Sequence, residues 1–173
     1  MTLLTKFKKH ISKYRERRFW RHPDYSIVAI KLKDSEQVYG CVRNGLARLE
    51  RIPKPETGYH YHDIVEVEGP VGTQILREDE INEFRAIKIH RKSNRPTYIF
   101  EAILPDKKDY FYLHQEFEDL GQKSEFPWST LDNNQEWRRG YCTAINIKHA
   151  EYILTTFCQK GNGRKVKNIE CGD

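Results

Sequence analysis

Apolar residues near the start of the chain recur at the spacing of an α-helix. Leu3, Phe7 and Ile11 share one face of such a helix, and lysines and arginines fill most of the remaining positions. This pattern predicts an amphipathic helix with a basic face. The helix is expected to end before Pro23, because the residue preceding proline is disfavoured in the α region. We therefore expect an N-terminal basic helix over residues 1–22.

Residues 25–92 alternate apolar and polar side chains with a period of two, which is typical of strands with one buried face. Asn44-Gly45 is a strong hairpin signal because both residues tolerate a positive φ, whereas Gly69-Pro70 predicts the end of a strand. The stretch predicts a small antiparallel β unit, either a sheet or a partial barrel. The expected strands cover residues 25–33, 37–43, 46–52, 62–68 and 83–90.

Residues 97–173 combine segments with the helical spacing of apolar residues and segments typical of strands. These segments follow the order β-α-β-β-α-β. Asp106 is placed to cap the first helix, and Gly121 is a natural residue to end it. Two interleaved β-α-β halves predict a ferredoxin-like unit, with both helices on one face of a four-stranded sheet. The whole chain is therefore expected to have an α+β fold. The expected strands are 97–104, 123–128, 138–147 and 164–171, and the expected helices are 106–120 and 149–160.

Segments 47–53 (ARLERIP) and 62–67 (HDIVEV), followed by the β-α-β-β-α-β half, resemble a family of small bacterial proteins classed as a domain of unknown function (DUF4265). The resemblance covers roughly residues 36–171 and leaves the basic helix outside. It implies the same architecture, a small β unit before a ferredoxin-like half. It implies no catalytic residues that could be carried over to this chain.

Charge is distributed unevenly along the chain. The net charge is +5, yet residues 1–22 alone carry eight lysines and arginines against Glu16, so the rest of the chain is slightly acidic. This asymmetry indicates that the N-terminal helix binds a partner. It does not indicate a surface that binds nucleic acid over its whole extent. The helix could equally lie on a membrane surface, on nucleic acid or against the protein's own body.

Cysteine usage and hydropathy favour a cytoplasmic protein without a membrane span or a signal peptide. No apolar run approaches the roughly 20 residues that cross a bilayer, and the N-terminus lacks the pattern of a signal peptide. The four cysteines are not spaced as CxxC and suit reduced thiols. They are Cys41, Cys142, Cys158 and Cys171.

The sequence contains none of the signatures GxSxG, HExxH, Walker A or Rossmann GxGxxG. His60 and His62 are the best metal-like pair, because alternate residues of a strand share a face. A third ligand would have to come from elsewhere in the chain, for example His90 or His114, and nothing in the sequence fixes it. We therefore expect a protein that is not an enzyme and that holds no metal or other cofactor.

Aromatic residues flank a polar, acidic loop at residues 126–137 (FPWSTLDNNQEW). Aromatic anchors within a polar rim are typical of protein interfaces, although the tryptophans could instead fold back onto the sheet. The loop favours a non-catalytic module that binds a protein partner, most concretely an immunity protein that neutralises a bacterial toxin. The expected partner-binding residues are Phe126, Trp128, Asp132, Glu136, Trp137 and Tyr141.

An RNA-binding protein is the alternative. RNA-recognition modules share the β-α-β-β-α-β order and carry a basic-Gly-aromatic run on their third strand, which Arg139-Gly140-Tyr141 matches. Thr143 occupies the place of the second stacking aromatic, and Tyr98 or Phe100 offers a ring on the first strand. The expected nucleic-acid-binding residues are Lys6, Lys9, Lys13, Arg17, Arg18 and Arg139.

Overall fold

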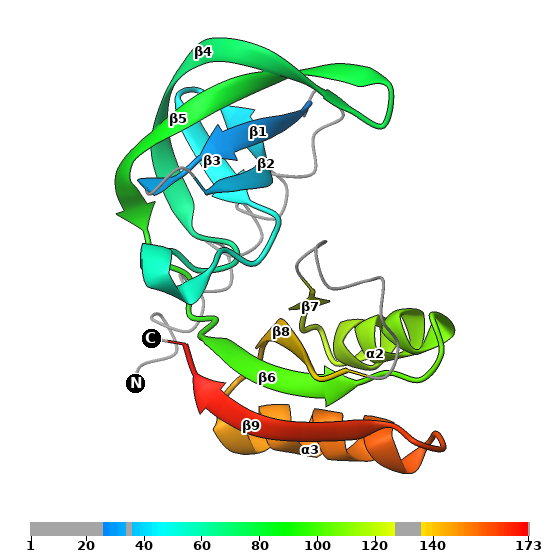
Figure 1. The fold of residues 1–173 in the computed structure, drawn as a ribbon. Coiled ribbons are helices and arrows are strands. Elements are labelled where there is room, and N and C mark those ends of the chain that lie inside the picture. The colour runs from blue at the N-terminus through cyan, green and yellow to red at the C-terminus, as the bar shows by residue number, and fades with distance from the viewer. Residues whose placement is uncertain (1–25, 34–35, 127–135, 173) are drawn as a thin grey trace, which may run out of the picture.

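A computed structural model describes residues 26–33, 36–126 and 136–172, which form two units that follow each other along the chain (Figure 1). The first unit consists of strands, and the second combines strands with two helices. The α+β class predicted from the sequence is therefore confirmed. The predicted basic helix over residues 1–22 lies outside the described residues.

The first unit is a closed barrel whose strands are hydrogen-bonded in the order β1-β2-β3-β4-β5. Neighbouring strands are antiparallel, but residues 29–31 of β1 pair in parallel with residues 83–85 of β5 and close the barrel. Closure leaves no open sheet edge. The alternating pattern predicted the strands and their buried faces, but it does not specify which terminal strands pair. The strands are β1 (Ile27–Lys31), β2 (Gln37–Arg43), β3 (Leu46–Leu49), β4 (Ile64–Leu76) and β5 (Asp79–Arg91).

Strands β4 and β5 form a long ribbon that reaches beyond the other strands of the barrel (Figure 1). The expected strand end at Gly69-Pro70 is wrong, because β4 continues on the far side of a bulge. The register moves from Glu68 opposite Arg85 to Gly72 opposite Glu83. A bulge leaves residues of one strand unpaired, so it accommodates a proline that has no N–H to donate.

The turns between β2 and β3 and between β4 and β5 have the same backbone form but different sequences. Asn44 and Gly45 have φ values of 52° and 73°, which confirms the predicted turn between β2 and β3. Arg77 and Glu78, between β4 and β5, also have positive φ values, of 51° and 80°. A turn with two positive φ values matches the twist of a hairpin, but an Arg-Glu pair does not predict it from sequence.

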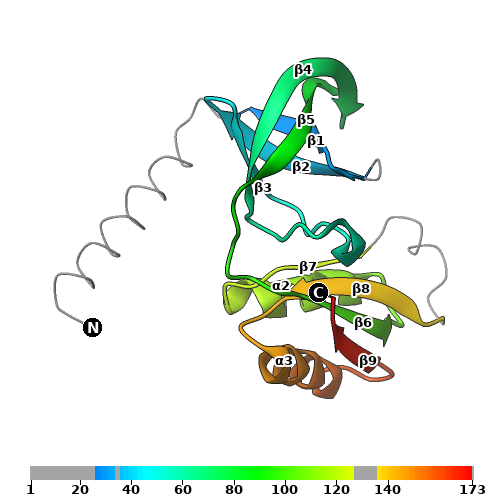
Figure 2. The ribbon, with the colours of Figure 1, turned by 90° about the vertical axis from the view of Figure 1, so that its left-hand side faces the viewer.

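The second unit is a four-stranded sheet in the order β7-β8-β6-β9, with antiparallel pairing between all neighbours. Figure 2 shows this sheet and its helices below the barrel. The elements are β6 (Thr97–Ile103), α2 (Lys108–Asp119), β7 (Ser124–Glu125), β8 (Arg138–Thr143), α3 (Ile147–Gln159) and β9 (Lys165–Cys171). Among the described residues, no helix is long and apolar enough to cross a membrane.

One face of the sheet packs against both helices. Tyr98, Phe100 and Ala102 of β6 share this face, because every second residue of a strand points to the same side. They belong to a core cluster that also contains Leu113 and Phe117 of α2. The same cluster includes Ala150, Ile153, Leu154 and Phe157 of α3. Both helices therefore cover the same side of β6.

The helix ends follow from local hydrogen bonds. Helix α2 begins after Lys107, and the Asp106 carboxylate accepts the Lys108 N–H at 2.8 Å, which confirms the predicted capping by Asp106. The Asp106 N–H in turn donates to the Asp109 carboxylate at 3.0 Å. The Gly121 N–H donates to the carbonyl of Glu118 at 2.8 Å, with a φ of 68°, as expected for a helix-ending glycine. Helix α3 is capped by Asn146, whose side chain accepts from a backbone N–H in the first turn.

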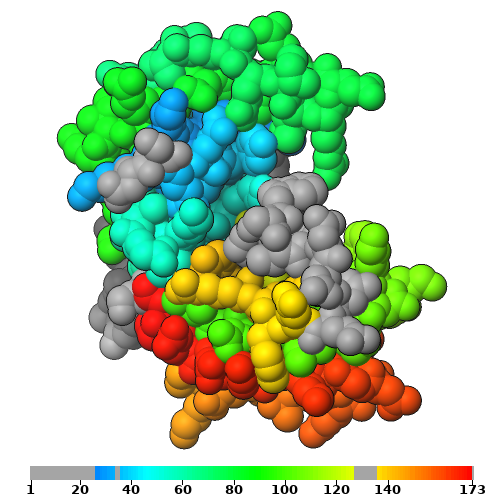
Figure 3. Space-filling model, in the orientation of Figure 1, coloured from blue at the N-terminus to red at the C-terminus, as the bar shows by residue number. Residues whose placement is uncertain are grey.

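The barrel rests on the opposite face of the sheet through a small apolar cluster. Ile52 and Tyr61, from the segment that joins β3 and β4 of the barrel, meet Ile99 of β6 and Tyr141 of β8, and all four are nearly buried. Beside them, the 3-10 turn η2 (Pro55–Thr57) sits on the C-terminal end of β9 (Figure 3). The sheet thus has one face covered by helices and another that the barrel covers only in part.

Candidate functional site

The sheet face opposite the helices, here called the open face, carries two rows of side chains that run across neighbouring strands. In the row nearest the barrel, Ile99 stands opposite Tyr141. These residues are only 8% and 7% exposed, because Ile52 and Tyr61 of the barrel cover them. This row serves the contact between the two units.

The second row of the open face is charged. Glu101 of β6 stands between Arg139 of β8 and Lys167 of β9. Its carboxylate lies 3.2 Å from the Lys167 Nζ and accepts a 2.7 Å hydrogen bond from Asn168. Arg139 lies 3.7 Å from the carboxylate of Glu56 on η2. Positive and negative groups therefore alternate along this row and compensate one another.

Trp137 stands at the far end of the open face, next to the charged row. It immediately precedes β8, is 40% exposed, and its ring centroid lies 4.1 Å from the Lys167 Nζ. An ammonium group at this distance is attracted by the face of the indole. A groove of about 420 Å³ runs along the same face. It is lined by Ile99, Glu101, Arg139, Asn168, Ile169 and Glu170.

The structure separates the residues that the sequence grouped as a partner-binding site. Glu136 and Trp137 are exposed. Phe126 points inward, with its ring 5.4 Å from Phe100 and 5.0 Å from Tyr110 in edge-to-face contacts. Tyr141 lies under the barrel, as described above. Trp128 and Asp132 lie outside the described residues.

The residues of the RNA-binding alternative are also dispersed. Lys6, Lys9, Lys13, Arg17 and Arg18 lie outside the described residues, and Arg139 is the member that the structure places on the open face. Tyr98 and Phe100 point to the helix side and belong to the core. Since Tyr141 is covered as well, none of the three aromatic rings offers a face on which a base could stack.

His60 and His62 lie in a turn before β4 rather than within a strand, so the alternation that would place them on one face does not apply. The His62 ring stacks on Tyr61 at 3.9 Å, and its Nε2 lies 3.2 Å from the carboxylate of Glu50. Within residues 26–33, 36–126 and 136–172, no three His, Cys, Asp or Glu side chains gather as a metal site would require.

Burial makes three of the cysteine thiols less acidic, because it raises their pKa. Cys142 is fully buried in the core between sheet and helices, and burial raises the pKa of its thiol. Burial also raises the pKa of Cys158 on α3 and of Cys41 on β2. A raised pKa disfavours the thiolate, which is the nucleophilic form.

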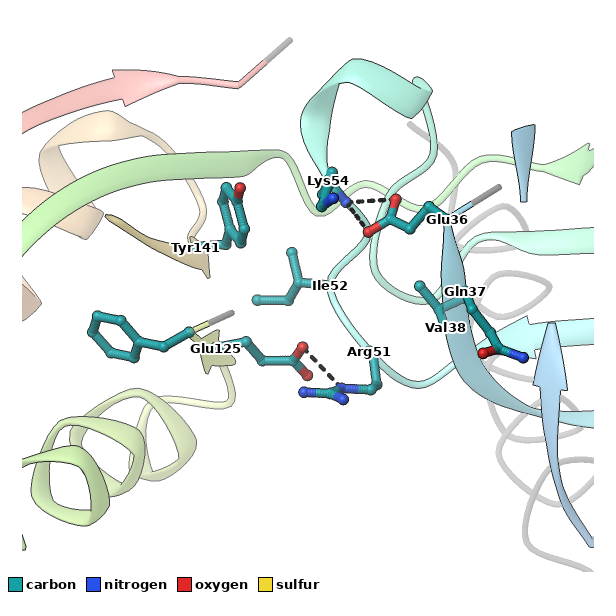
Figure 4. Close-up of a pocket in the computed structure, with 9 residues that line it drawn as sticks. Glu36, Gln37, Val38, Arg51, Ile52, Lys54, Glu125 and Tyr141 are labelled. Carbon is teal, nitrogen blue, oxygen red and sulfur yellow. Dashed lines mark hydrogen bonds and ion pairs between the residues drawn. The ribbon is translucent and has the colours of Figure 1, made fainter. Parts of the chain in front are cut away.

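A cleft opens where the barrel meets the sheet, beside the apolar row (Figure 4). Its volume is about 120 Å³. The barrel side contributes residues around the start of β2 and the segment that follows β3, and the sheet side contributes the end of β7 and one residue of β8. The lining residues are Glu36, Gln37, Val38, Arg51, Ile52, Lys54, Glu125, Phe126 and Tyr141.

Two carboxylates and two cationic residues line this cleft, namely Glu36, Glu125, Arg51 and Lys54. The Glu125 carboxylate lies 3.1 Å from the Arg51 Nε, yet burial raises the pKa of Glu125 because desolvation outweighs the nearby guanidinium. The two Glu36 oxygens accept the Lys54 backbone N–H at 2.9 and 3.0 Å, and burial raises the pKa of Glu36 as well. Sequence reasoning missed this site, because its residues come from distant segments without a shared motif.

Comparisons with known proteins found one similar solved structure and no matching family model or curated protein. No family model and no curated protein matches the chain, so the predicted family resemblance stays a prediction. One solved structure, a hypothetical protein from Neisseria gonorrhoeae, is similar with a TM-score of 0.36 and 16% identity. The match covers 85% of this chain and 95% of that chain. A TM-score this low supports no statement about function.

Proposed function

We propose that this chain is a non-catalytic module that binds a protein partner through the open face of its sheet at Trp137. The observation that carries the proposal is the position of this tryptophan, which is 40% exposed and lies against Lys167 of the charged row. Tryptophan is enriched among the residues that dominate the binding energy of protein interfaces, usually within a polar rim.

The charges around Trp137 favour a protein over a nucleic acid. Glu101 and Glu170 line the groove together with Arg139, and Lys167 is held by Glu101. Nucleic-acid surfaces concentrate positive charge to neutralise phosphates, whereas mixed charges that can pair across an interface fix the orientation of a protein partner.

The most concrete form of the proposal is a cytoplasmic immunity protein that neutralises a toxin domain. The small size of the chain, the absence of catalytic signatures from its sequence and the inactive state of its buried thiols support a role in binding. We also infer a ferredoxin-like arrangement for the second unit. Its element order and its strand order β7-β8-β6-β9 support this assignment. Such a fold is compatible with many functions, so the argument rests on the site.

Co-expression tests the proposed function. Each open reading frame beside the gene is expressed in a bacterial host with the wild-type chain, with Trp137→Ala or with Phe111→Ala. Phe111 is the matched control, because this aromatic residue is 76% exposed on α2, on the helix side of the sheet. We expect one neighbouring frame to be toxic and to be neutralised by the wild type and Phe111→Ala, but not by Trp137→Ala.

Two results would contradict the proposal. The first is that no neighbouring frame is toxic and that the purified chain retains no protein partner. The second is that the chain binds RNA with an affinity that falls steeply with salt, because counterion release then dominates the interaction.

A further inference from the structure

One charged side chain lies inside the core between the sheet and its helices. Arg138, the first residue of β8, is only 3% exposed. It pairs with Ala102 of β6, which belongs to this core, so its side chain points to the helix side. Its Nη1 donates to the hydroxyl of Tyr110 on α2, and its Cζ lies 5.6 Å from the centroid of the same ring. Its Nη2 is buried and has no hydrogen-bond partner in the part of the chain that the structure describes.

The two other charged side chains that are buried among the described residues have their charges compensated. Asp63 accepts two backbone N–H groups, at 2.8 and 2.6 Å. Asp109 forms an ion pair with Arg164, whose Nη2 lies 2.7 Å away. Arg138 has no carboxylate within ion-pair distance in the described ranges of the chain. It is therefore the buried charge that the described residues leave without a counter-charge.

A buried guanidinium cannot relieve this situation by losing its proton, because arginine keeps its charge in proteins. Removing a charge from water without an opposite charge beside it costs free energy. The face of the Tyr110 ring attracts the cation, but the ring has no net charge and cannot replace an anion. A bound anion would supply the counter-charge and would also accept a hydrogen bond from the Arg138 Nη2.

Charge and geometry favour a carboxylate as this anion. The Tyr110 hydroxyl accepts a hydrogen bond from Arg138, so its own O–H is available to donate. Together with the Arg138 Nη2 it offers two neighbouring donors, which match the two oxygens of a carboxylate. One carboxylate balances one guanidinium, whereas a phosphate dianion would bring an excess charge into a buried place. The nearby carboxylates of α2 are engaged elsewhere, since Asp106 caps the helix and Asp109 pairs with Arg164.

We propose that Arg138, beside the Tyr110 hydroxyl, binds a carboxylate group of a ligand. Arg138 is the first residue of its strand, so a local shift at the strand end admits the group while the rest of β8 stays paired. A small organic acid and a glutamate or aspartate side chain of a protein present the same group, and the test distinguishes them. The proposal does not depend on the partner-binding role of Trp137, whose side chain lies on the open face.

The test is an NMR titration of the full chain at constant ionic strength. Acetate represents a free small acid, the capped tripeptide acetyl-Gly-Glu-Gly-amide represents a protein side chain, and inorganic phosphate is the more highly charged anion. We expect at least one carboxylate probe to cause saturable shifts of amide signals around residues 108–112 and 138–140. Tighter binding of the tripeptide points to a protein side chain, and equal or tighter binding of acetate points to a small molecule.

Substitutions then assign the binding to Arg138. Arg138→Met removes the charge but keeps an unbranched side chain, and is expected to abolish the saturable shifts. Arg138→Lys keeps the charge but loses the planar fork, and is expected to raise Kd about tenfold, as for the loss of one charge-assisted hydrogen bond. Arg85→Met is the control, because Arg85 is exposed and pairs with Glu68 on the barrel. Its Kd should equal that of the wild type.

Urea denaturation without any probe gives an independent readout. Replacing a buried charge that lacks a counter-charge by an apolar side chain is neutral or stabilising, so Arg138→Met should unfold at the same urea concentration as the wild type or at a higher one. A purely structural arginine would give a lower midpoint. The proposal is overturned if neither carboxylate probe saturates, if phosphate binds more tightly than both, or if Arg138→Met binds like the wild type.

Discussion

The two faces of the four-stranded sheet are built from the same strands but have opposite compositions. On the helix side, Tyr98, Phe100 and Ala102 of β6 are buried among the side chains of α2 and α3. On the open face, β6 presents Ile99 under the barrel and then Glu101 in an ion pair with a neighbouring strand. The first face stabilises the fold, and the second carries polar groups and the exposed tryptophan to which we assign the proposed partner binding. Substitutions on the two faces should therefore have different consequences.

The largest effect is expected at Phe100, whose side chain is fully buried on the helix side. Phe100→Ala should lower the free energy of unfolding by about 3–5 kcal/mol, because it removes buried apolar contacts and leaves a cavity. Glu101→Ala, one residue along on the other face, should cost at most about 1 kcal/mol, since it breaks a partly exposed ion pair. Urea denaturation of both variants measures the difference, and equal losses would contradict the distinction between the two faces.

The next effect is expected at Ile52, which carries the contact between barrel and sheet and is 5% exposed. Ile52→Ala should cost about 2–3 kcal/mol, at the lower end for a buried isoleucine, because its cluster contains only four residues. Denaturation followed separately by tryptophan fluorescence and by circular dichroism checks this value. A loss below about 0.5 kcal/mol would mean that the barrel contact contributes little to stability.

Gly140 tests how tightly the helix side is packed. A Cβ at this position would lie 2.5 Å from the Phe100 Cζ and 2.8 Å from the Phe126 Cε1, so Gly140→Ala forces both rings to move. The expected cost is about 1–3 kcal/mol, as is typical of overpacked cores. The same denaturation assay measures it. A neutral substitution would show that Phe100 and Phe126 have room to shift.

The smallest effect concerns the pH dependence of stability at Glu125. Because its folded pKa is raised, the folded state takes up a proton more readily than the unfolded state. The stabilisation of the folded state by protonation of Glu125 is fully present below the unfolded pKa. It is lost as the pH rises through the folded pKa. The free energy of unfolding of the wild type, relative to Glu125→Gln, should therefore increase as the pH falls from 7 towards 4.5. A difference that is constant or decreases would contradict the raised pKa.

Local sequence patterns predicted many of the strands, helices and turns. They do not predict features that depend on contacts between distant segments. The predicted strand over residues 97–104 and the Asn44-Gly45 turn correspond to the observed β6 and to the observed hairpin. The continuation of β4 past Gly69-Pro70 was not predictable, because a bulge accommodates the proline. The parallel pairing of β1 with β5 depends on barrel closure, which no local pattern encodes.

The candidate sites were less predictable than the fold. Trp137 was predicted as a partner-binding residue, and the structure places it on an exposed face. Phe126 was grouped with it because both are aromatic, but its ring completes the core instead. The cleft between Glu36 and Glu125 is formed by residues far apart in the sequence, so only the folded chain brings them together.

The affinity of a purified partner for Trp137→Ala tests the central claim most directly. Calorimetry compares the wild type with Trp137→Ala and with Phe111→Ala, after denaturation has shown that neither variant changes stability by more than about 1 kcal/mol. We predict that Trp137→Ala weakens binding by about 2 kcal/mol or more, roughly thirtyfold in Kd, and that Phe111→Ala has little effect. Equal affinity of Trp137→Ala and the wild type would contradict the claim that this face recognises the partner.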